Sequence, residues 1–271
     1  MIKSKIFDDV SNNRVYLYEL YPQDYPRIIE YLNNLALKNN YTKIFSKIPS
    51  KFLPGFISDG YRIEAYIPKL YINDDAVFVC KYFNDERQKI NKSEIEIFQN
   101  IILNNHYANY TIPKQERYII RRLGLDNAKD IKIIFKNVFE SYPFPIFDES
   151  YIKETIANKS NIYFGAIYND NLIAVSSAEI NDIYKYAEMT DFAVLEEHRG
   201  NNLAILLLNY MEDELINEKY KMFYTIARLN SPSMNIIFLK NKYKYSGTLI
   251  NNTHIGGKIE SMNVLYKYAR K

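Results

Sequence analysis

The sequence predicts an α/β (α+β) protein whose mixed, mostly antiparallel central sheet is flanked by helices. Short segments of alternating apolar residues, such as VYLYEL at 15–20, are typical of half-buried strands. Longer segments with apolar residues at helical spacing, such as 127–142, are typical of amphipathic helices. The length of 271 residues favours two domains. We expect a smaller N-terminal α/β domain at 1–85, a helical linker at 86–116 and a larger domain at 117–271.

The composition excludes several classes of protein. Apolar residues make up 47% and charged residues 25% of the chain, so we expect neither disorder nor a fibrous repeat. The net charge of +3 is spread along the chain, which argues against nucleic-acid binding. The longest apolar runs, such as 204–208, are far shorter than the roughly 18–20 residues of a membrane span. Residues 1–10 lack the apolar core of a secretory signal, and Cys80 is the only cysteine. We therefore expect a cytoplasmic protein, not bound to a membrane, with no metal.

The first half of the chain predicts alternating strands and helices. After the strand at 15–20, a helix begins near 22–24, because proline is favoured at helix entries and Ile28, Ile29 and Leu32 follow at helical spacing. The remaining elements expected here are a strand at 41–46, a short helix at 49–58, strands at 61–67 and 76–83, and a helix at 93–104 capped by Ser93.

The second half predicts a sheet interrupted by helices. The turn Asn169-Asp170 separates two apolar segments and indicates a hairpin. Pro143 and Pro145 are expected to end the helix at 127–142. The other expected elements are a strand at 118–123, a helix at 150–158, strands at 163–168, 172–180 and 187–195, a helix at 203–218, a strand at 222–227, a helix at 233–240, and strands at 245–251 and 261–268.

A faint internal repeat relates the two halves. Residues 26–83 and 203–268 both read as helix, strand, short helix and two strands. The first copy has nothing that resembles the loop at 196–204. We therefore interpret the N-terminal domain as a degenerate half-domain that serves packing.

The segment FAVLEEHRGNNLAILLL at 192–208 carries the most chemical information. An apolar strand runs into a small-residue loop that opens an apolar helix. The unpaired N–H groups at such a helix start, together with the helix dipole, favour phosphate binding. Gly200 allows close approach to the backbone, and Arg199 adds charge. The alternative interpretation is an ordinary strand-to-helix turn.

The residues Arg199-Gly200-Asn201-Asn202-Leu203-Ala204 resemble the acetyl-CoA signature of the GNAT superfamily of N-acetyltransferases. The resemblance covers about 117–271 and implies the GNAT fold, with acetyl-CoA as cosubstrate. Asn202 replaces the central glycine, and asparagine tolerates left-handed backbone, so we expect the loop to form. The residues implied to bind the cofactor are Phe192, Ala193, Val194, Arg199, Gly200, Asn201, Asn202, Leu203, Ala204 and Ser231.

Other segments resemble the beta-lysine N-acetyltransferase family. They are Tyr142–Ile146, Glu188–Ala193, 224–228, 247–253 and 259–264. The resemblance implies acetylation of the terminal amine of beta-lysine (3,6-diaminohexanoate), a small-molecule amine, to give the compatible solute N-epsilon-acetyl-beta-lysine. Two alternatives stay open: acetylation of another small amine, such as a polyamine or lysine, and a CoA-binding module without catalysis. The sequence leaves the oligomeric state open and allows a homodimer.

The resemblance also implies catalytic roles. An ammonium must lose a proton before it attacks a thioester, and Glu188 stands where several relatives place this general base. The alternative for Glu188 is a strand-end carboxylate paired with a lysine. On an ideal strand Asp191 faces the side opposite to Glu188, unless a bulge turns it. Phe238 stands at the position of the usual acid tyrosine, which leaves Ser231, Ser233 or Tyr224 as substitutes.

For the acceptor we expect a pocket near the C-terminal strands. Arg228 is the candidate for a substrate carboxylate because of its fork geometry, Asp191 is a candidate for an ammonium, and Tyr142 would line the opposite wall. The further candidates are Asn251, Asn252, Glu260 and Asn263. The alternative is a solvated hairpin in which the asparagines satisfy turns.

Overall fold

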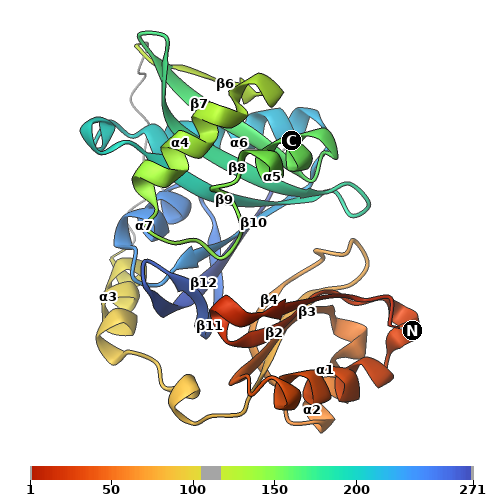
Figure 1. Cartoon of the computed structure of the whole chain (residues 1–271). Coiled ribbons are helices and arrows are strands. Elements are labelled where there is room, and N and C mark those ends of the chain that lie inside the picture. Colours follow the sequence, from red (N-terminus) through yellow and green to blue (C-terminus); the bar gives the residue numbers. More distant parts are fainter. Residues whose placement is uncertain (1, 105–116, 270–271) are drawn as a thin grey trace.

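The computed structural model describes residues 2–104 and 117–269, and it contains two β-sheets that pack on one another (Figure 1). The first sheet has the order β1-β2-β3-β5-β4 and the second the order β11-β12-β10-β9-β8-β7-β6. The strands of the first sheet are β1 (Lys5–Asp9), β2 (Arg14–Glu19), β3 (Lys43–Pro49), β4 (Arg62–Ile67) and β5 (Ala76–Tyr82). Those of the second are β6 (Ile119–Leu123), β7 (Asn161–Tyr168), β8 (Asn171–Asn181), β9 (Tyr186–Val194), β10 (Met222–Arg228), β11 (Lys244–Ile255) and β12 (Lys258–Tyr268).

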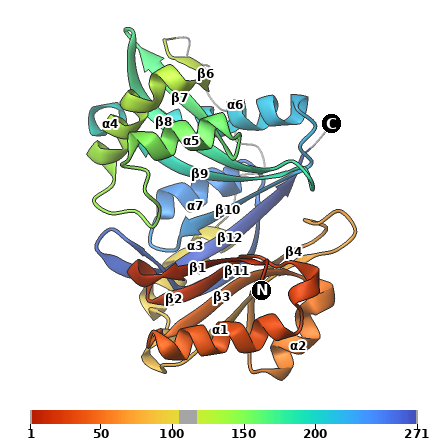
Figure 2. The ribbon, with the colours of Figure 1, turned by 45° about the vertical axis from the view of Figure 1, so that its right-hand side comes forward.

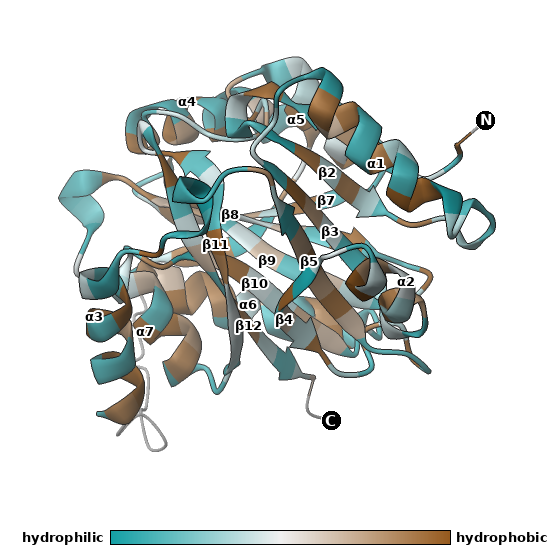
Figure 3. Ribbon diagram, turned by 90° about the horizontal axis from the view of Figure 1, so that it is seen from below, coloured by the Kyte–Doolittle hydropathy of each residue, from teal (hydrophilic) through white to brown (hydrophobic). Residues whose placement is uncertain are grey.

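Helices pack on one face of the first sheet and on both faces of the second. The helices are α1 (Arg27–Lys38), α2 (Leu53–Ser58), α3 (Lys92–Leu103), α4 (Ala128–Val138), α5 (Glu149–Ala157), α6 (Leu203–Asn217) and α7 (Pro232–Lys240). Helices α1 and α2 lie on the far side of the first sheet (Figure 2), and α1 carries both hydrophobic and hydrophilic segments (Figure 3). In the second sheet α4 and α5 pack on one face, and α6 and α7 on the other.

The alternation of β2 explains why the first sheet has two apolar faces. Val15 and Leu17 point to the core beneath α1, whereas Tyr16 joins a second core together with Phe45. This second core also contains Tyr224 and other residues of β10 and β12. Successive strand residues point to opposite faces, so one apolar strand serves both cores. The two sheets are therefore joined by a shared, aromatic-rich core.

The two halves repeat one strand arrangement. In the first sheet β2 runs parallel to β3, which continues antiparallel through β5 to β4. In the second, β9 runs parallel to β10, which continues antiparallel through β12 to β11. The strand pairing thus agrees with the repeat seen in the sequence.

An irregularity in β11 holds the halves together. The register of β11 against β12 shifts between Leu249 and Thr253. The carbonyls of the three intervening residues accept hydrogen bonds from buried cations of the N-terminal half. Lys43 Nζ donates to Ile250 O at 2.7 Å, Arg87 Nε to Asn251 O at 2.7 Å, and Arg14 Nη1 to Asn252 O at 2.5 Å.

The structure corrects several expected element boundaries. The helix expected at 127–142 ends at Val138, because Phe139 is extended and its ring packs on that of Tyr142. Helix α3 is capped by Asn91, whose side chain accepts from the Ser93 amide, and not by Ser93. Strand β1 was not expected, because its KIFDD sequence is short and charged. Of the expected linker, residues 105–116 lie outside the described residues.

Among residues 2–104 and 117–269, no helix is long and apolar enough to cross a membrane.

Gly247 tests the contact between the sheets. A Cβ at this position would lie 2.0 Å from the carbonyl oxygen of Glu64, a backbone atom of the other sheet. We expect Gly247→Ala to reduce the free energy of unfolding by about 3 kcal/mol, since neither backbone can move without separating the sheets. Urea denaturation measures this. Gly124→Ala is the matched control, because an added Cβ there meets open space. Equal stability of the two variants would contradict the close approach.

Candidate active site

The central feature of the site is a gap between two parallel strands. Strands β9 and β10 pair only from Met222 opposite Tyr186 to Tyr224 opposite Glu188. Beyond this point both strands continue, but they no longer pair with one another. We call the cavity between them the strand gap; it is lined by Phe139, Tyr142, Met189, Thr190, Asp191, Phe192, Thr225, Ile226, Ala227, Arg228, Ser231, Met234, Phe238, Ile255 and Met262.

A bulge in β9 sets the direction of Asp191. Thr190 pairs with Ser177, but Ala193 pairs with Val175, so two residues of β9 oppose one of β8. Asp191 is one of the two bulged residues, and its φ of 55° lies in the left-handed region. Its carboxylate accepts from Ser177 Oγ and from Tyr142 OH, each at 2.5 Å. On an ideal strand Asp191 would face away from Glu188, but the bulge turns it to the same side, which is the exception that the sequence analysis named.

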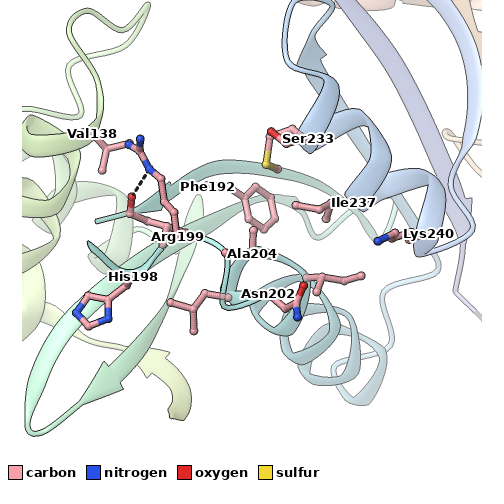
Figure 4. A pocket seen from close by; sticks show the side chains of 14 residues that line it. Val138, Phe192, His198, Arg199, Asn202, Ala204, Ser233, Ile237 and Lys240 are labelled. Atoms are coloured by element: carbon pink, nitrogen blue, oxygen red, sulfur yellow. Dashed lines mark hydrogen bonds between the residues drawn. The ribbon is translucent and has the colours of Figure 1, made fainter. Parts of the chain in front are cut away.

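Next to the strand gap lies a cleft of about 400 Å³ at the start of α6, which we call the helix cleft (Figure 4). The side chain of Phe192 lies between the start of α6 and helix α7 (Figure 4). The cleft is lined by Val138, Phe192, Val194, His198, Arg199, Gly200, Asn202, Leu203, Ala204, Ile205, Ser233, Met234, Ile237 and Lys240. Phe192 and Met234 line both cavities, so the helix cleft continues into the strand gap.

The backbone of the loop turns as an anion site requires. Gly200 has φ of 79° and Asn202 has φ of 58°, both in the left-handed region. The expectation that asparagine can replace glycine here is confirmed for the backbone. No side chain of the described residues caps the N-terminus of α6, so its first amides are available to a ligand. Arg199 lies at the same cleft, where its Nε donates to Val194 O at 3.3 Å.

Three predicted cofactor residues lie elsewhere. Ala193 is fully buried in the core beneath α4. Asn201 is turned into the loop itself: its side chain donates to His198 O at 3.0 Å and accepts from Arg117. Ser231 lines the strand gap and not the helix cleft.

Beyond the strand gap lies a third cavity, which both halves of the molecule form. We call it the acidic chamber; it is lined by Arg14, Tyr16, Tyr18, Phe45, Tyr142, Pro143, Phe144, Glu179, Glu188, Thr190, Ile226, Asn252, Thr253, Ile255 and Met262. The residues that it shares with the strand gap are Tyr142, Thr190, Ile226, Ile255 and Met262. Glu179 and Glu188 pair directly across β8 and β9.

Burial disfavours the charged form of the carboxyl groups in this region. Burial, followed by the charges of Glu188 and Asp191, raises the pKa of Glu179. Burial also raises the pKa of Glu188 and of Asp191. A raised pKa makes a carboxylate a stronger proton acceptor, which suits a general base.

One cation from the first sheet opposes this effect. Lys47 is 4% exposed, and its Nζ donates to Tyr224 OH at 2.9 Å. It also lies over the rings of Tyr18, Tyr186 and Tyr224, 5.2–5.3 Å from their centres. Its charge lowers the pKa of Glu188 and of Glu179 against the effect of burial. The N-terminal half thus acts on the electrostatics of the predicted base.

The predicted substrate residues separate into two groups. Tyr142, Asp191 and Arg228 line the strand gap, and Asn252 lines the acidic chamber. However, Arg228 forms a two-point ion pair with Glu260, with Nε–Oε2 at 2.8 Å and Nη2–Oε1 at 2.7 Å. The fork expected to bind a substrate carboxylate is therefore occupied by another predicted residue.

Two further predicted residues have structural partners. The Asn251 side chain donates to the carbonyls of Arg87 and Lys89, so it anchors the segment after β5. Asn263 is fully buried; it donates to Asn235 at 3.0 Å and accepts from Thr248 at 2.7 Å. Neither lines the cavities described above, because both side chains point into these local networks.

Sequence reasoning missed Glu179, Lys47 and Arg14. Glu179 could have been found, since a hairpin with Ile180 opposite Ala187 places Glu179 opposite Glu188. No local sequence pattern marks Lys47 and Arg14 as site residues, because their place at the site depends on how the two sheets pack.

The acidic chamber opens to solvent through a groove of about 530 Å³, which we call the outer groove. It shares Tyr16, Tyr18 and Glu179 with the chamber and carries Asp8 and Asp9 on its wall. The strand gap therefore adjoins both the helix cleft and the acidic chamber, and the chamber adjoins the outer groove.

Comparisons with known sequences agree with this arrangement. The model of the Acetyltransferase (GNAT) family matches residues 129–237. The chain is 36% identical over 259 residues to a beta-lysine N(6)-acetyltransferase of Methanococcus maripaludis, covering 94% of this chain and 93% of that protein. It is 32% identical to the N-acetyltransferase YodP of Bacillus subtilis, covering 86% of this chain and 84% of that one.

Solved structures show the same fold in the C-terminal part. The ribosomal-protein-S18-alanine N-acetyltransferase of Escherichia coli aligns with a TM-score of 0.50 at 13% identity, covering 57% of this chain and 95% of that one. The spermidine N-acetyltransferase of Vibrio cholerae, in complex with CoA and spermine, gives 0.50 at 19% identity and 57% and 97% coverage.

The raised pKa of Glu179 predicts a pH dependence of stability. Its pKa is about 8 in the folded protein, against 4.5 ordinarily. As pH rises through this window the unfolded chain releases a proton that the folded chain keeps, so stability falls. We expect Glu179→Gln to make this fall shallower, measured by urea unfolding from about pH 5 to about pH 8. The exposed Glu154→Gln on α5 is the control, and an unchanged slope in Glu179→Gln would refute the assignment.

Proposed function

This chain belongs to the GNAT family of N-acetyltransferases, and on that premise we propose that it transfers the acetyl group of acetyl-CoA to the terminal amine of beta-lysine. The observation that carries the proposal is the acidic chamber, which Glu179 and Glu188 line, together with the adjoining strand gap, which Asp191 lines. Three carboxylates suit an acceptor with two ammonium groups. The extended similarity to a beta-lysine N(6)-acetyltransferase supports the same acceptor.

The helix cleft fits the diphosphate of the cosubstrate. The left-handed turns at Gly200 and Asn202 present the first amides of α6, where the positive end of the helix dipole favours anions. Arg199 and Lys240 line the same cleft and add positive charge. The pantetheine arm would then extend past Phe192 into the strand gap, which places the thioester beside the acidic chamber.

In the proposed reaction Glu188 accepts a proton from the terminal ammonium. The freed amine attacks the acetyl carbon, a nitrogen–carbon bond forms and the carbon–sulfur bond breaks. The nitrogen loses its second proton as the thiolate gains one, so CoA leaves as the thiol and one proton passes to solvent. Burial raises the pKa of Glu188 and so strengthens it as a proton acceptor, and the charge of Lys47 offsets part of this rise. Attack is direct, since the single cysteine, Cys80, is buried in the first sheet.

The leaving thiolate has no tyrosine at the usual position. Phe238 occupies it, is 1% exposed and packs edge-on against Phe192. Of the three substitutes considered, Tyr224 is held by Lys47 and Ser233 lines the helix cleft. Ser231 lines the strand gap, and we assign the hydrogen bond to the leaving sulfur to it.

The biological setting follows from the acceptor. Acetylation removes the positive charge of the terminal amine and leaves a zwitterion without net charge. Such a product suits a role as a cytoplasmic compatible solute, which we propose together with the reaction.

Glu188→Gln tests the base. We expect kcat with beta-lysine and acetyl-CoA to fall by about 10²–10⁴ at neutral pH, because the amide cannot accept a proton. Release of free CoA measures turnover, and mass spectrometry identifies the acetylated nitrogen. Glu154→Gln should retain wild-type turnover. A loss of less than about threefold in Glu188→Gln would remove this residue from the role, and no turnover by the wild type would refute the proposed function.

Asn202 tests the cofactor loop. We expect Asn202→Gly to keep the affinity for acetyl-CoA and Asn202→Val to weaken it about tenfold, because a β-branched residue resists φ of 58°. Isothermal titration calorimetry measures the Kd. Asn169→Val is the control, since Asn169 is also left-handed, at φ of 47°, but lies in the hairpin turn after β7. Equal affinities of all three variants would show that acetyl-CoA does not depend on this loop.

A further inference from the structure

Arg14 places a positive charge in the acidic chamber. Its Nε donates to Asp9 at 2.8 Å and its Nη1 to Asn252 O at 2.5 Å. The guanidinium carbon lies 5.1 Å from the ring centre of Tyr16 and 5.3 Å from that of Phe45. Neither hydrogen bond uses Nη2. Arg14 is only 3% exposed and lines the chamber, so a ligand in the chamber meets a fixed, largely desolvated donor.

Asn252 provides an acceptor beside it. The residue is 2% exposed, and its Oδ1 has no hydrogen-bond partner among the described residues. A buried amide oxygen without a donor is costly unless a ligand supplies an N–H group. Because Asn252 O also accepts from Arg14, the free amide oxygen and the guanidinium lie at the same wall.

The chamber therefore has two chemically different parts. Glu179 and Glu188 provide carboxyl groups from the second sheet, and Arg14 provides positive charge from the first. Arg14 pairs with Asp9, and among the described residues it forms no ion pair with either glutamate. The expected carboxylate receptor, Arg228, is occupied by Glu260. This separation of acidic and basic groups matches a molecule with an amine at one end and an amino-acid group at the other.

We propose that the N-terminal half helps to bind the amino-acid end of the acceptor. Arg14 Nη2 donates to the substrate carboxylate, and Asn252 Oδ1 accepts from the neighbouring 3-ammonium. The glutamates of the second sheet hold the terminal amine. This inference rests on the proposed function and deepens it: the first sheet selects amino acids over simple diamines, whose second ammonium a buried guanidinium repels.

The matched acceptor for a test is 1,4-diaminopentane, which is beta-lysine without its carboxylate. In Arg14→Met we expect kcat/KM for beta-lysine to fall about ten- to a hundredfold, as expected for the loss of a hydrogen bond between charged groups. The value for 1,4-diaminopentane should stay equal or rise, and KM for acetyl-CoA should not change. A purely structural role of Arg14 would lower turnover of both acceptors together.

Arg87→Met is the matched control variant. Arg87 is also buried and also donates to a carbonyl of β11, that of Asn251, but it does not line the chamber. Any loss it causes should be the same for both acceptors. If Arg14→Met does not fold, Arg14→Lys keeps the charge toward Asp9 without the fork, and we expect it to lose about tenfold with beta-lysine alone.

The outcomes separate the two proposals. Selective loss with beta-lysine supports the inference. Equal loss with both acceptors, or unchanged kcat/KM for beta-lysine, overturns it while the acetyltransferase reaction with beta-lysine stands. If the wild type releases no CoA with either acceptor, the proposed function fails and the inference fails with it.

Discussion

The architecture depends on three backbone carbonyls that a single strand leaves unpaired. Where β11 loses its register, the carbonyls of residues 250–252 each accept a hydrogen bond from a buried cation of the N-terminal half, Lys43, Arg87 or Arg14. Buried polar groups must be paired on both sides, so these bonds satisfy the strand and the cations together. Lys43 is further held by Glu64, whose carboxylate accepts the Ile250 amide at 3.0 Å. The irregular strand thereby fixes where the two sheets meet.

This docking is also what completes the site. The C-terminal half alone supplies the strand gap, the helix cleft and the glutamates. The first sheet closes the acidic chamber with Arg14, Tyr16 and Tyr18, and its Lys47 moderates the pKa values that burial raises. Neither half contains the whole chemistry. The N-terminal half, which the sequence suggested was used for packing, is part of the chamber wall.

What could be predicted from the sequence is what depends on neighbouring residues. The alternation of β2, the left-handed Asn202 and the helix start at Leu203 all follow from local pattern and backbone preference. The direction of Asp191 could not be predicted, because one extra residue in β9 reverses its face. The partner of Arg228 and the position of Arg14 depend on contacts between distant segments. Such contacts leave no periodic signal in the chain.

The contact between β4 and β11 determines which strand edges become exposed when the two halves of the molecule separate. They are corresponding strands of the two repeats, and each lies at the edge of its sheet. Ser246 bonds to the backbone of Tyr66, and Gly247 lies against Glu64, so the two edges shield one another. An open edge is a template for intermolecular strand pairing. Undocking of the halves would expose two such edges at once, so the interface that builds the pocket also guards the protein against aggregation.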